Sequence, residues 1–208
     1  MTNMVRIGLL ALVVGTVYTA SALAAPIGPN VCPNVGADTD CGILITVGAS
    51  GTPVVTATGQ PPYDNLEDTL VGVINNSTAV IPFLDLSSTT DIFGFDGDGI
   101  CTFATPGCPT DTTGYGGRVS ANLLYDPAGP ITTFTNIGSG ATTGRVVFGA
   151  AGIPVGGSAY FSLEESLTPA EIVVRPPTAA PEPSSLFLLG SGTLAGLLRT
   201  VRRRRIRA

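Results

Sequence analysis

Three residue types are missing from this 208-residue chain, which contains no His, no Lys and no Trp. Without His, Ser-His-Asp and Cys-His catalytic arrangements and His-ligated zinc are excluded. Without Lys, a lysine Schiff base is excluded as well. Charged residues are also scarce, at 12% of the chain, and aromatic residues make up only 6%. These absences exclude many of the side-chain groups that enzymes commonly use for catalysis.

Glycine and proline are plentiful instead, with 27 and 17 residues. They are the two poorest helix formers, so a helix-rich fold is disfavoured. The mean hydropathy of +0.40 argues against a disordered chain, because disordered chains are poor in apolar residues and rich in charge. The length allows one domain with tails at its ends.

The net charge of −5 hides an uneven distribution. Residues 25–180 contain three Arg and fourteen acidic residues, which gives this part a formal charge of −11. Such a surface repels the phosphates of nucleic acids, so a nucleic-acid partner is not expected. Six of the ten Arg lie between residues 199 and 207.

The first 24 residues have the layout of a secretory signal peptide. One positive charge precedes an apolar stretch over residues 7–17, and Ala22 and Ala24 then form an A-x-A site just before Ala25. The apolar stretch is shorter than the ~20 residues that a spanning helix needs, which disfavours an uncleaved anchor. We therefore predict an N-terminal signal helix that signal peptidase removes after Ala24.

Export places the four cysteines in an oxidising compartment, which favours disulfides. Cys32 lies near Cys41, and Cys101 lies near Cys108. Their spacings fit no zinc pattern. Four cysteines allow three pairings, of which the two local pairs are the simplest, and the sequence leaves the connectivity open.

Residues 25–175 are predicted to form an all-β ectodomain, a single antiparallel β-sandwich of the jelly-roll or immunoglobulin-like kind. Short β-prone runs are separated by turn residues at the spacing typical of a sandwich. The runs at 69–74 and 79–84 flank Asn75-Asn76-Ser77 and are predicted to form a hairpin. The other expected strands are 43–47, 53–58, 119–125, 131–135, 145–148, 159–163 and 171–174.

The C-terminal part combines three features in a fixed order. Residues 176–183 form a Pro-rich linker that ends in Pro181-Glu182-Pro183, and residues 184–208 contain a short apolar stretch followed by Arg. We expect this stretch to be a marginal transmembrane helix whose Arg cluster stays cytoplasmic, so that the body faces outward across the inner membrane. The cluster comprises Arg199, Arg202, Arg203, Arg204 and Arg205.

This order of motif, apolar helix and Arg cluster resembles the PEP-CTERM sorting signal of Gram-negative bacteria, over residues 181–205. The resemblance implies recognition by an exosortase, a membrane-embedded cysteine protease or transpeptidase, with cleavage near residues 181–183. It also implies a host that makes exopolysaccharide and biofilm. The alternative is an ordinary C-terminal anchor with stop-transfer charges.

Three stretches of the body, 63–77, 91–102 and 158–164, resemble a recurrent ectodomain of PEP-CTERM proteins. This second resemblance is consistent with the sorting signal. It identifies no catalytic residues in this chain.

The Asp-rich stretch that contains Asp91, Asp96 and Asp98 is the best candidate for a ligand site. Carboxylates on Asp-Gly turns are typical of calcium loops, although the position at which an EF-hand carries Glu is Gly107 here. The alternative is two plain Asp-Gly turns beside a disulfide. Asp91, Asp111 or the Glu67–Asp68 pair could complete a calcium site; otherwise no cofactor is expected.

Paired carboxylates also suggest a glycosidase, since those enzymes use two. The pairs are Asp96 with Asp98 and Glu164 with Glu165. Adjacent residues on a strand point to opposite faces, so Glu164 and Glu165 should not cooperate. A catalytic role is therefore not expected.

Three functional hypotheses follow. The first is a non-enzymatic, exported surface or matrix protein, transiently anchored and then located at the cell surface or outside the cell, that contributes to the extracellular polysaccharide layer. The second is a binding module for a glycan or surface ligand, with calcium as a candidate cofactor. The third is a carboxylate-based hydrolase.

Overall fold

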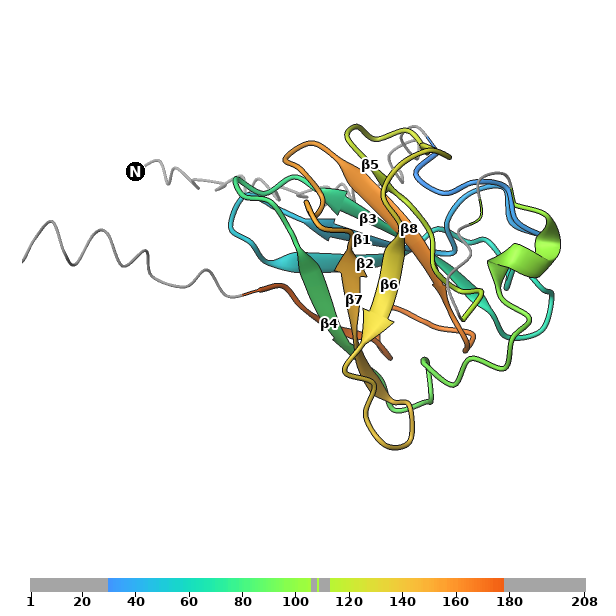
Figure 1. Ribbon diagram of the computed structural model, residues 1–208. Helices are drawn as coiled ribbons and strands as arrows, with labels where there is room; N and C mark the ends of the chain where they lie inside the picture. Colours follow the sequence, from blue (N-terminus) through green and yellow to red (C-terminus); the bar gives the residue numbers. More distant parts are fainter. Residues whose placement is uncertain (1–29, 106–107, 109–112, 178–208) are drawn as a thin grey trace, which may run out of the picture.

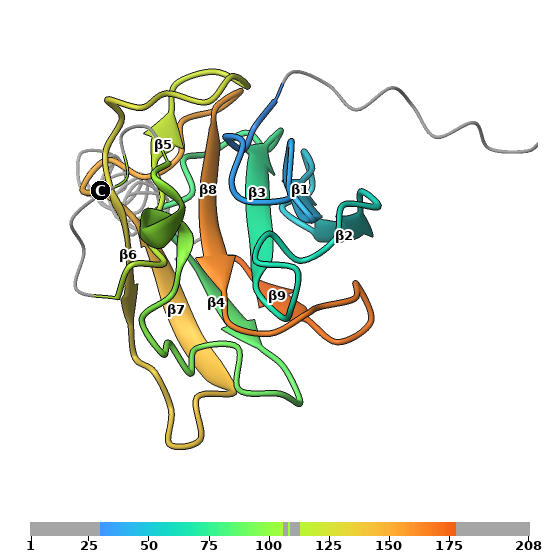
Figure 2. The same ribbon diagram turned by 90° about the vertical axis from the view of Figure 1, so that its right-hand side faces the viewer.

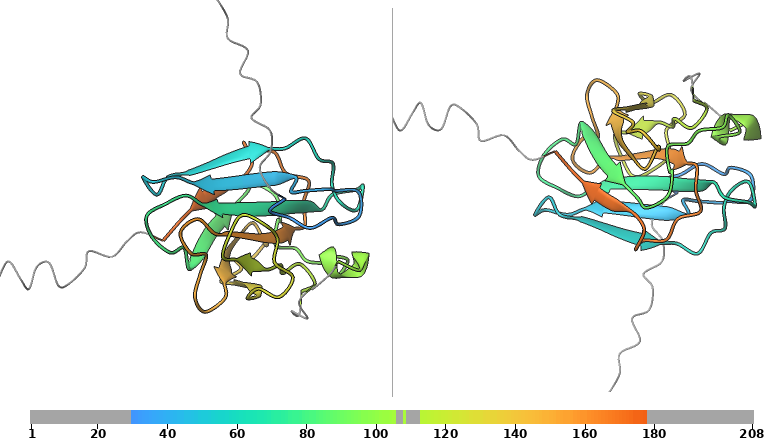
Figure 3. Two further views of the ribbon diagram at one scale, coloured as in Figure 1. Left: turned by 90° about the horizontal axis from the view of Figure 1, so that it is seen from above. Right: turned by 90° about the horizontal axis from the view of Figure 1, so that it is seen from below.

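The computed structural model describes residues 30–105, 108 and 113–177, which form two packed β-sheets. One sheet has five strands in the order β2-β1-β3-β8-β5, and the other has four in the order β6-β7-β4-β9. Figure 1 shows β4, β7 and β6 side by side, with the strands of the five-stranded sheet running in a different direction. In Figure 3, β2, β1 and β3 lie side by side as one layer.

The strands are short, and a single 3₁₀ helix, η1, accompanies them in the described part of the chain. Their bounds are β1 Ile43–Val47, β2 Pro53–Ala57, β3 Thr69–Asn75, β4 Phe83–Ser87, η1 Ile100–Phe103, β5 Val119–Ser120, β6 Thr132–Thr135, β7 Thr143–Phe148, β8 Ser158–Leu163 and β9 Val173–Arg175. The predicted all-β architecture with two antiparallel-rich sheets is confirmed. Within these residues, none forms a helix with the length and hydrophobicity that crossing a bilayer requires.

The main core fills the space between the two sheets. Alternate residues of each strand point into it, as the two-residue period of a strand requires. On β1 these are Ile43, Ile45 and Val47, and on β4 they are Leu84 and Leu86. The other face of β4 and β7 is only half-buried, and there Arg145 pairs with Asp85 through two hydrogen bonds of 2.7 and 2.9 Å.

The five-stranded sheet is covered on its outer face as well. A second apolar cluster packs there, built from the N-terminal segment, the loop before β3 and η1. Leu70 of β3 and Tyr160 of β8 point into this cluster, whereas their neighbours Val71 and Phe161 point into the main core. β3 is therefore buried on both faces.

Gly72 in the middle of β3 allows the Cys32–Cys41 disulfide to lie directly on the strand. A Cβ atom at residue 72 would lie 2.3 Å from the sulfur of Cys41 and 3.1 Å from Leu44. No side chain fits at that distance, so the sequence has glycine where the N-terminal segment crosses the sheet.

One pairing differs from the predicted antiparallel arrangement. β1 and β3 are parallel, with Ile43 opposite Val71, so the five-stranded sheet is mixed. The reason is that β2 folds back antiparallel along one edge of β1, and the following loop returns the chain to the other edge of β1 in its original direction. The continuous burial of β3 is typical of a strand in a parallel pairing.

The predicted hairpin between residues 69–74 and 79–84 is wrong. Both edges of β3 are occupied, by β1 and by β8, so β4 has no place beside it and joins the other sheet. Asn75 directs this crossing. Its side-chain amide donates toward the carbonyls of Ala79, Ile153 and Pro154 at 2.9 to 3.1 Å, and its Oδ1 accepts from Ser77.

Most strands differ from their predicted bounds by at least one residue, including β4, β5 and β9. β4 begins at Phe83, after Pro82, which has no N–H to donate to a ladder. β5 ends at Ser120 because Asn122 forms a local turn, in which its Oδ1 accepts from the N–H of Leu124 at 2.8 Å. β9 begins at Val173, two residues later than expected.

Replacement of Gly72 by Ala should destabilise the protein by about 1–3 kcal/mol, because the added methyl group overlaps the Cys41 sulfur. Chemical denaturation measures this loss. Gly48→Ala is the matched control, since a Cβ there has no neighbour within 4 Å, and it should change stability by less than about 0.5 kcal/mol. Equal effects of the two substitutions would contradict the close packing at residue 72.

Replacement of Asn75 by Asp should destabilise the protein by at least about 2 kcal/mol. The substitution removes the donors to three carbonyl groups and places a charge where the side chain is fully buried. Asn76→Asp, one residue further on and exposed, is the control and should be nearly neutral in thermal unfolding. A stable N75D variant would show that the crossing does not depend on this amide.

Candidate functional site

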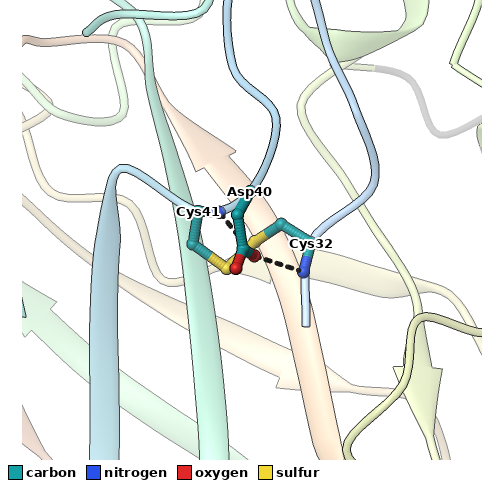
Figure 4. Close-up of side chains that lie close together, drawn as sticks. All are labelled: Cys32, Asp40 and Cys41. Atoms are coloured by element: carbon teal, nitrogen blue, oxygen red, sulfur yellow. Dashed lines mark hydrogen bonds between the residues drawn. A yellow bond between two sulfur atoms is a disulfide. The ribbon is translucent and has the colours of Figure 1, made fainter. Parts of the chain in front are cut away.

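Both predicted local disulfides are present. Cys32 pairs with Cys41 and Cys101 with Cys108, with Cα–Cα distances of 5.1 and 5.5 Å. Figure 4 shows Asp40 against the first bond, where its Oδ1 accepts from the backbone N–H of Cys41 at 2.8 Å and of Cys32 at 3.3 Å. Because both sulfurs are bonded to each other, this group is structural and offers no thiolate to a metal.

A cluster of acidic residues lies at the end of the molecule that carries η1, the end facing the reader in Figure 2. There the loop before β3, the 91–99 loop and the residue after β8 come together. β3 and β8 are antiparallel, so Asp68, just before β3, and Glu164, just after β8, emerge at the same edge. The cluster comprises Asp64, Asp68, Asp96, Asp98 and Glu164.

Asp98 belongs to two groups within this cluster. In one, a carboxylate oxygen from each of Asp96, Asp98 and Glu164 lies within 4.8 Å of the others. The hydroxyl of Tyr115 donates to Asp98 at 2.6 Å and to Asp96 at 3.2 Å. Backbone N–H groups donate to Asp96 and, at 3.4 Å, to Glu164, so this group is held by internal hydrogen bonds.

The second group joins Asp98 to Asp64 and Asp68, again with carboxylate oxygens within 4.8 Å of one another. Asp64 Oδ1 accepts from the N–H groups of Leu66, Glu67 and Asp68 at 3.0 to 3.1 Å, which closes the loop before β3. Asp68 is only 1% exposed, and within the described residues neither of its oxygens completes a hydrogen bond of normal geometry. Its carboxylate is therefore buried among other acids, and the neighbouring hydroxyl of Tyr63 does not complete a hydrogen bond of normal geometry to it.

The electrostatics of the cluster follow from burial and mutual repulsion. Burial raises the pKa of Asp68 to about 7, although the nearby hydroxyl of Tyr63 acts in the opposite direction. Burial also raises the pKa of Glu164 and, together with the adjacent Asp98, that of Tyr115. Hydrogen bonds from Asp98 hold the pKa of Asp96 below its usual value. The hydrogen bond from Tyr115 lowers the pKa of Asp98, but the neighbouring Asp96 and burial outweigh it, so that the pKa of Asp98 is raised.

The predicted ligand set Asp91, Asp96 and Asp98 is brought together only in part. Asp96 and Asp98 meet, but Asp91 lies beside Glu165, which it approaches closely enough to raise the pKa of Glu165. Glu164 and Glu165 both follow the end of β8, and they join different neighbours: Glu164 lies with Asp96 and Asp98, whereas Glu165 lies beside Asp91. Asp68 joins the cluster, whereas its neighbour Glu67 is exposed and Asp111 lies outside the described residues.

Sequence reasoning missed Asp64 and the part that Glu164 plays beside Asp96. Both depend on pairings between segments far apart in the chain. The signal available for Asp64 was its position four residues before Asp68 in a loop of turn-forming residues, a spacing that does not by itself indicate a shared site.

A second buried carboxylate without a donor in the described residues is Asp38, which is 1% exposed. Burial, reinforced by the charge of Asp40, raises the pKa of Asp38 to about 7. Asp38 lies within the loop closed by the Cys32–Cys41 disulfide, apart from the acidic cluster.

A shallow groove of about 560 Å³ lies at the opposite end of β1 and β3, beside Pro176 and Pro177. Its lining consists mainly of small apolar residues such as Ala49 and Ala79, together with three Ser or Thr residues and Arg175, and it contains neither a carboxylate nor an aromatic ring. It therefore offers no acid–base pair and no stacking surface.

The predicted signal-cleavage residues Ala22, Ala24 and Ala25 lie outside the described residues, as do Pro181, Glu182, Pro183 and the Arg cluster. For the C-terminal segment, a comparison with protein families supplies the result: residues 179–205 match the PEP-CTERM protein-sorting motif. The motif implies export, anchoring in the membrane before processing, and processing by an exosortase. Neither a curated protein nor a solved structure matches the chain.

Asp38 should make the protein less stable as pH rises. Its pKa increases from 3.8 to about 7 on folding, so between these values the folded state holds more protons than the unfolded state, and stability falls with increasing pH. Asp38→Asn should reduce the loss of stability between pH 5 and pH 8 by about 1–3 kcal/mol, measured by urea unfolding.

Asp68 titrates in the same range, so the slope in the D38N variant should shrink without vanishing. Asp126→Asn is the control, because Asn keeps the acceptor for the N–H of Ala128 in a surface turn, and its pH profile should match that of the unmodified protein. A D38N profile identical to that of the unmodified protein would contradict the shifted pKa.

Proposed function

We propose that this chain is an exported, non-enzymatic surface or extracellular-matrix protein of a Gram-negative bacterium. An exosortase cuts it from its membrane anchor, and its β-sandwich then forms part of the polysaccharide layer or biofilm. The observation that carries the proposal is the sorting motif at residues 179–205, which follows directly on a disulfide-linked β domain whose last strand ends at Arg175.

The construction of the domain supports a structural role. Both disulfides close short loops, and the five-stranded sheet is covered on both faces. Disulfides of this kind are typical of exported proteins. A β domain cross-linked by disulfides in this way suits a protein that must remain folded outside the cell.

The chemistry of the chain supports a non-enzymatic role. It has no His and no Lys to act as a general base or amine nucleophile. The carboxylates of Asp96, Asp98 and Glu164 lie within 4.8 Å and are held by hydrogen bonds to one another's backbone and to Tyr115. In glycosidases the two carboxyl groups flank the scissile bond of a bound sugar, whereas these three carboxylates are engaged in hydrogen bonds within their own cluster.

Processing at both ends is testable by intact-mass analysis of the protein from its host, combined with fractionation of cells and medium. We expect a mature product that begins near Ala25 and ends near Pro181 and has left the inner membrane. A variant with Ala at residues 181–183 should keep the Arg cluster and remain in the membrane fraction, because the exosortase recognition motif is gone.

A double substitution of Pro176 and Pro177 by Ala is the matched control, since these prolines lie outside the matched residues 179–205, and it should be processed normally. A wild-type product that retains Arg202–Arg205 in the membrane would overturn the proposal. It would make the protein a permanently anchored ectodomain.

A further inference from the structure

The buried carboxylate of Asp68 is the starting point. It is 1% exposed, and among the described residues it has neither a hydrogen-bond donor of normal geometry nor an ion pair. The hydroxyl of Tyr63 is fully buried beside it and lowers the pKa of Asp68, but it completes no hydrogen bond of normal geometry within these residues. Buried polar groups in folded proteins nearly always have a partner, and a buried carboxylate is costly without one. The burial of Asp68 therefore favours a positively charged ligand beside its carboxylate.

The surroundings of Asp68 supply the rest of a cation site. One oxygen of Asp68 lies within 4.8 Å of oxygens of Asp64 and Asp98. Oxygen ligands bind Ca²⁺ at 2.3–2.6 Å, so two ligands on opposite sides of the ion are about 5 Å apart. The three oxygens can thus contact one ion.

Two of the three carboxylates are already fixed in position. Three backbone N–H groups hold Asp64, and the hydroxyl of Tyr115 holds Asp98 at 2.6 Å. Asp68 directly precedes the buried strand β3, which fixes its backbone. A site whose ligands are held before the ion arrives binds it with little loss of side-chain freedom.

We propose that Asp64, Asp68 and Asp98 bind a calcium ion that ties the loop before β3 to the 91–99 loop. All three ligands are hard oxygen donors, and together they carry three negative charges once a bound cation keeps them ionised. Calcium is favoured over magnesium because Asp68 is buried and the ion must lose water to reach it, which Mg²⁺ does reluctantly. Asp96 and Glu164, on the other side of Asp98, add negative potential.

This inference goes beyond the proposed function and does not depend on it. An ion at this place joins segments that the two disulfides leave unconnected, whether or not an exosortase processes the chain. The ligand set also differs from the predicted set of Asp91, Asp96 and Asp98, because it keeps only Asp98, adds Asp64 and takes Asp68 from the alternatives that the sequence left open.

The test is thermal unfolding and calorimetric titration of the full-length protein after treatment with EGTA. Calcium chloride should bind at one site per chain, with a dissociation constant of about 10⁻⁴–10⁻³ M, as in extracellular calcium modules. At about ten times that concentration it should raise the melting temperature by about 3–6 °C. The same concentration of magnesium chloride should have a much smaller effect.

Asp68→Asn is the most informative variant, because its effect on the melting temperature should differ between EGTA and calcium. In EGTA the substitution removes an unpaired buried charge, so the melting temperature should stay the same or rise. In calcium the stabilisation should be lost. If Asp68 merely supports the fold, the variant should instead melt lower in both conditions by the same amount.

Asp91→Asn is the matched control and should keep the full calcium response, since Asp91 lies outside the site. Asp98→Asn should weaken binding at least about tenfold and serves as the second ligand variant if D68N fails to fold. The proposal is overturned if calcium does not bind the unmodified protein. It is also overturned if Asp91→Asn or Glu164→Gln abolishes binding while Asp68→Asn leaves it intact.

Discussion

The burial of β3 on both faces is the constraint on which the rest of the structure depends. A strand with two buried faces needs a second apolar layer, which the N-terminal segment, the loop before β3 and η1 provide. The segment that carries Cys32 and Cys41 lies so close to β3 that only glycine fits at residue 72. Because neighbours occupy both edges of β3, the following chain must leave the sheet, and Asn75 fixes where it turns.

The same constraint places the acidic cluster. Asp68 stands one residue before β3, so the layers that bury the strand also bury its carboxylate. Glu164 ends the antiparallel neighbour β8 at the same edge, and the 91–99 loop brings Asp96 and Asp98 across it. Five acids thus gather at one end of a domain whose body has few positive charges to offset them. A divalent cation is the simplest species that satisfies this arrangement.

The two ends of the domain have different characters. The acidic cluster and η1 lie at one end of β3. The shallow groove beside Pro176 and Pro177, which has no acidic residue in its lining, lies at the other end. The chain leaves β9 at that second end toward the sorting motif at 179–205. During membrane anchoring, the connection to the membrane therefore starts from the end of the domain that lacks the cluster.

The sequence by itself determined the features that depend on composition or on a short stretch of the chain, namely the fold class, the sorting signal and the local disulfides. The all-β class follows from β-prone runs separated by Gly, Pro and Asn, and the sorting signal is a contiguous motif that needs no fold to be recognised. The two disulfides join cysteines nine and seven residues apart, so short-range geometry was enough to favour them. Asp96 and Asp98 meet for the same reason, being two residues apart on one turn.

Only the tertiary structure decided the features that join distant segments. The parallel pairing of β1 with β3 and the failure of the 69–84 hairpin depend on which strand edges are already filled, and residue patterns do not encode that occupancy. Likewise, the sequence grouped Asp91 with Asp96 and Asp98 and left Asp68 as an alternative. The fold instead places Asp91 beside Glu165, selects Asp68 and adds Asp64 and Glu164. The burial of the Asp68 carboxylate is likewise a product of tertiary packing around the start of β3, so it exists only in the folded chain.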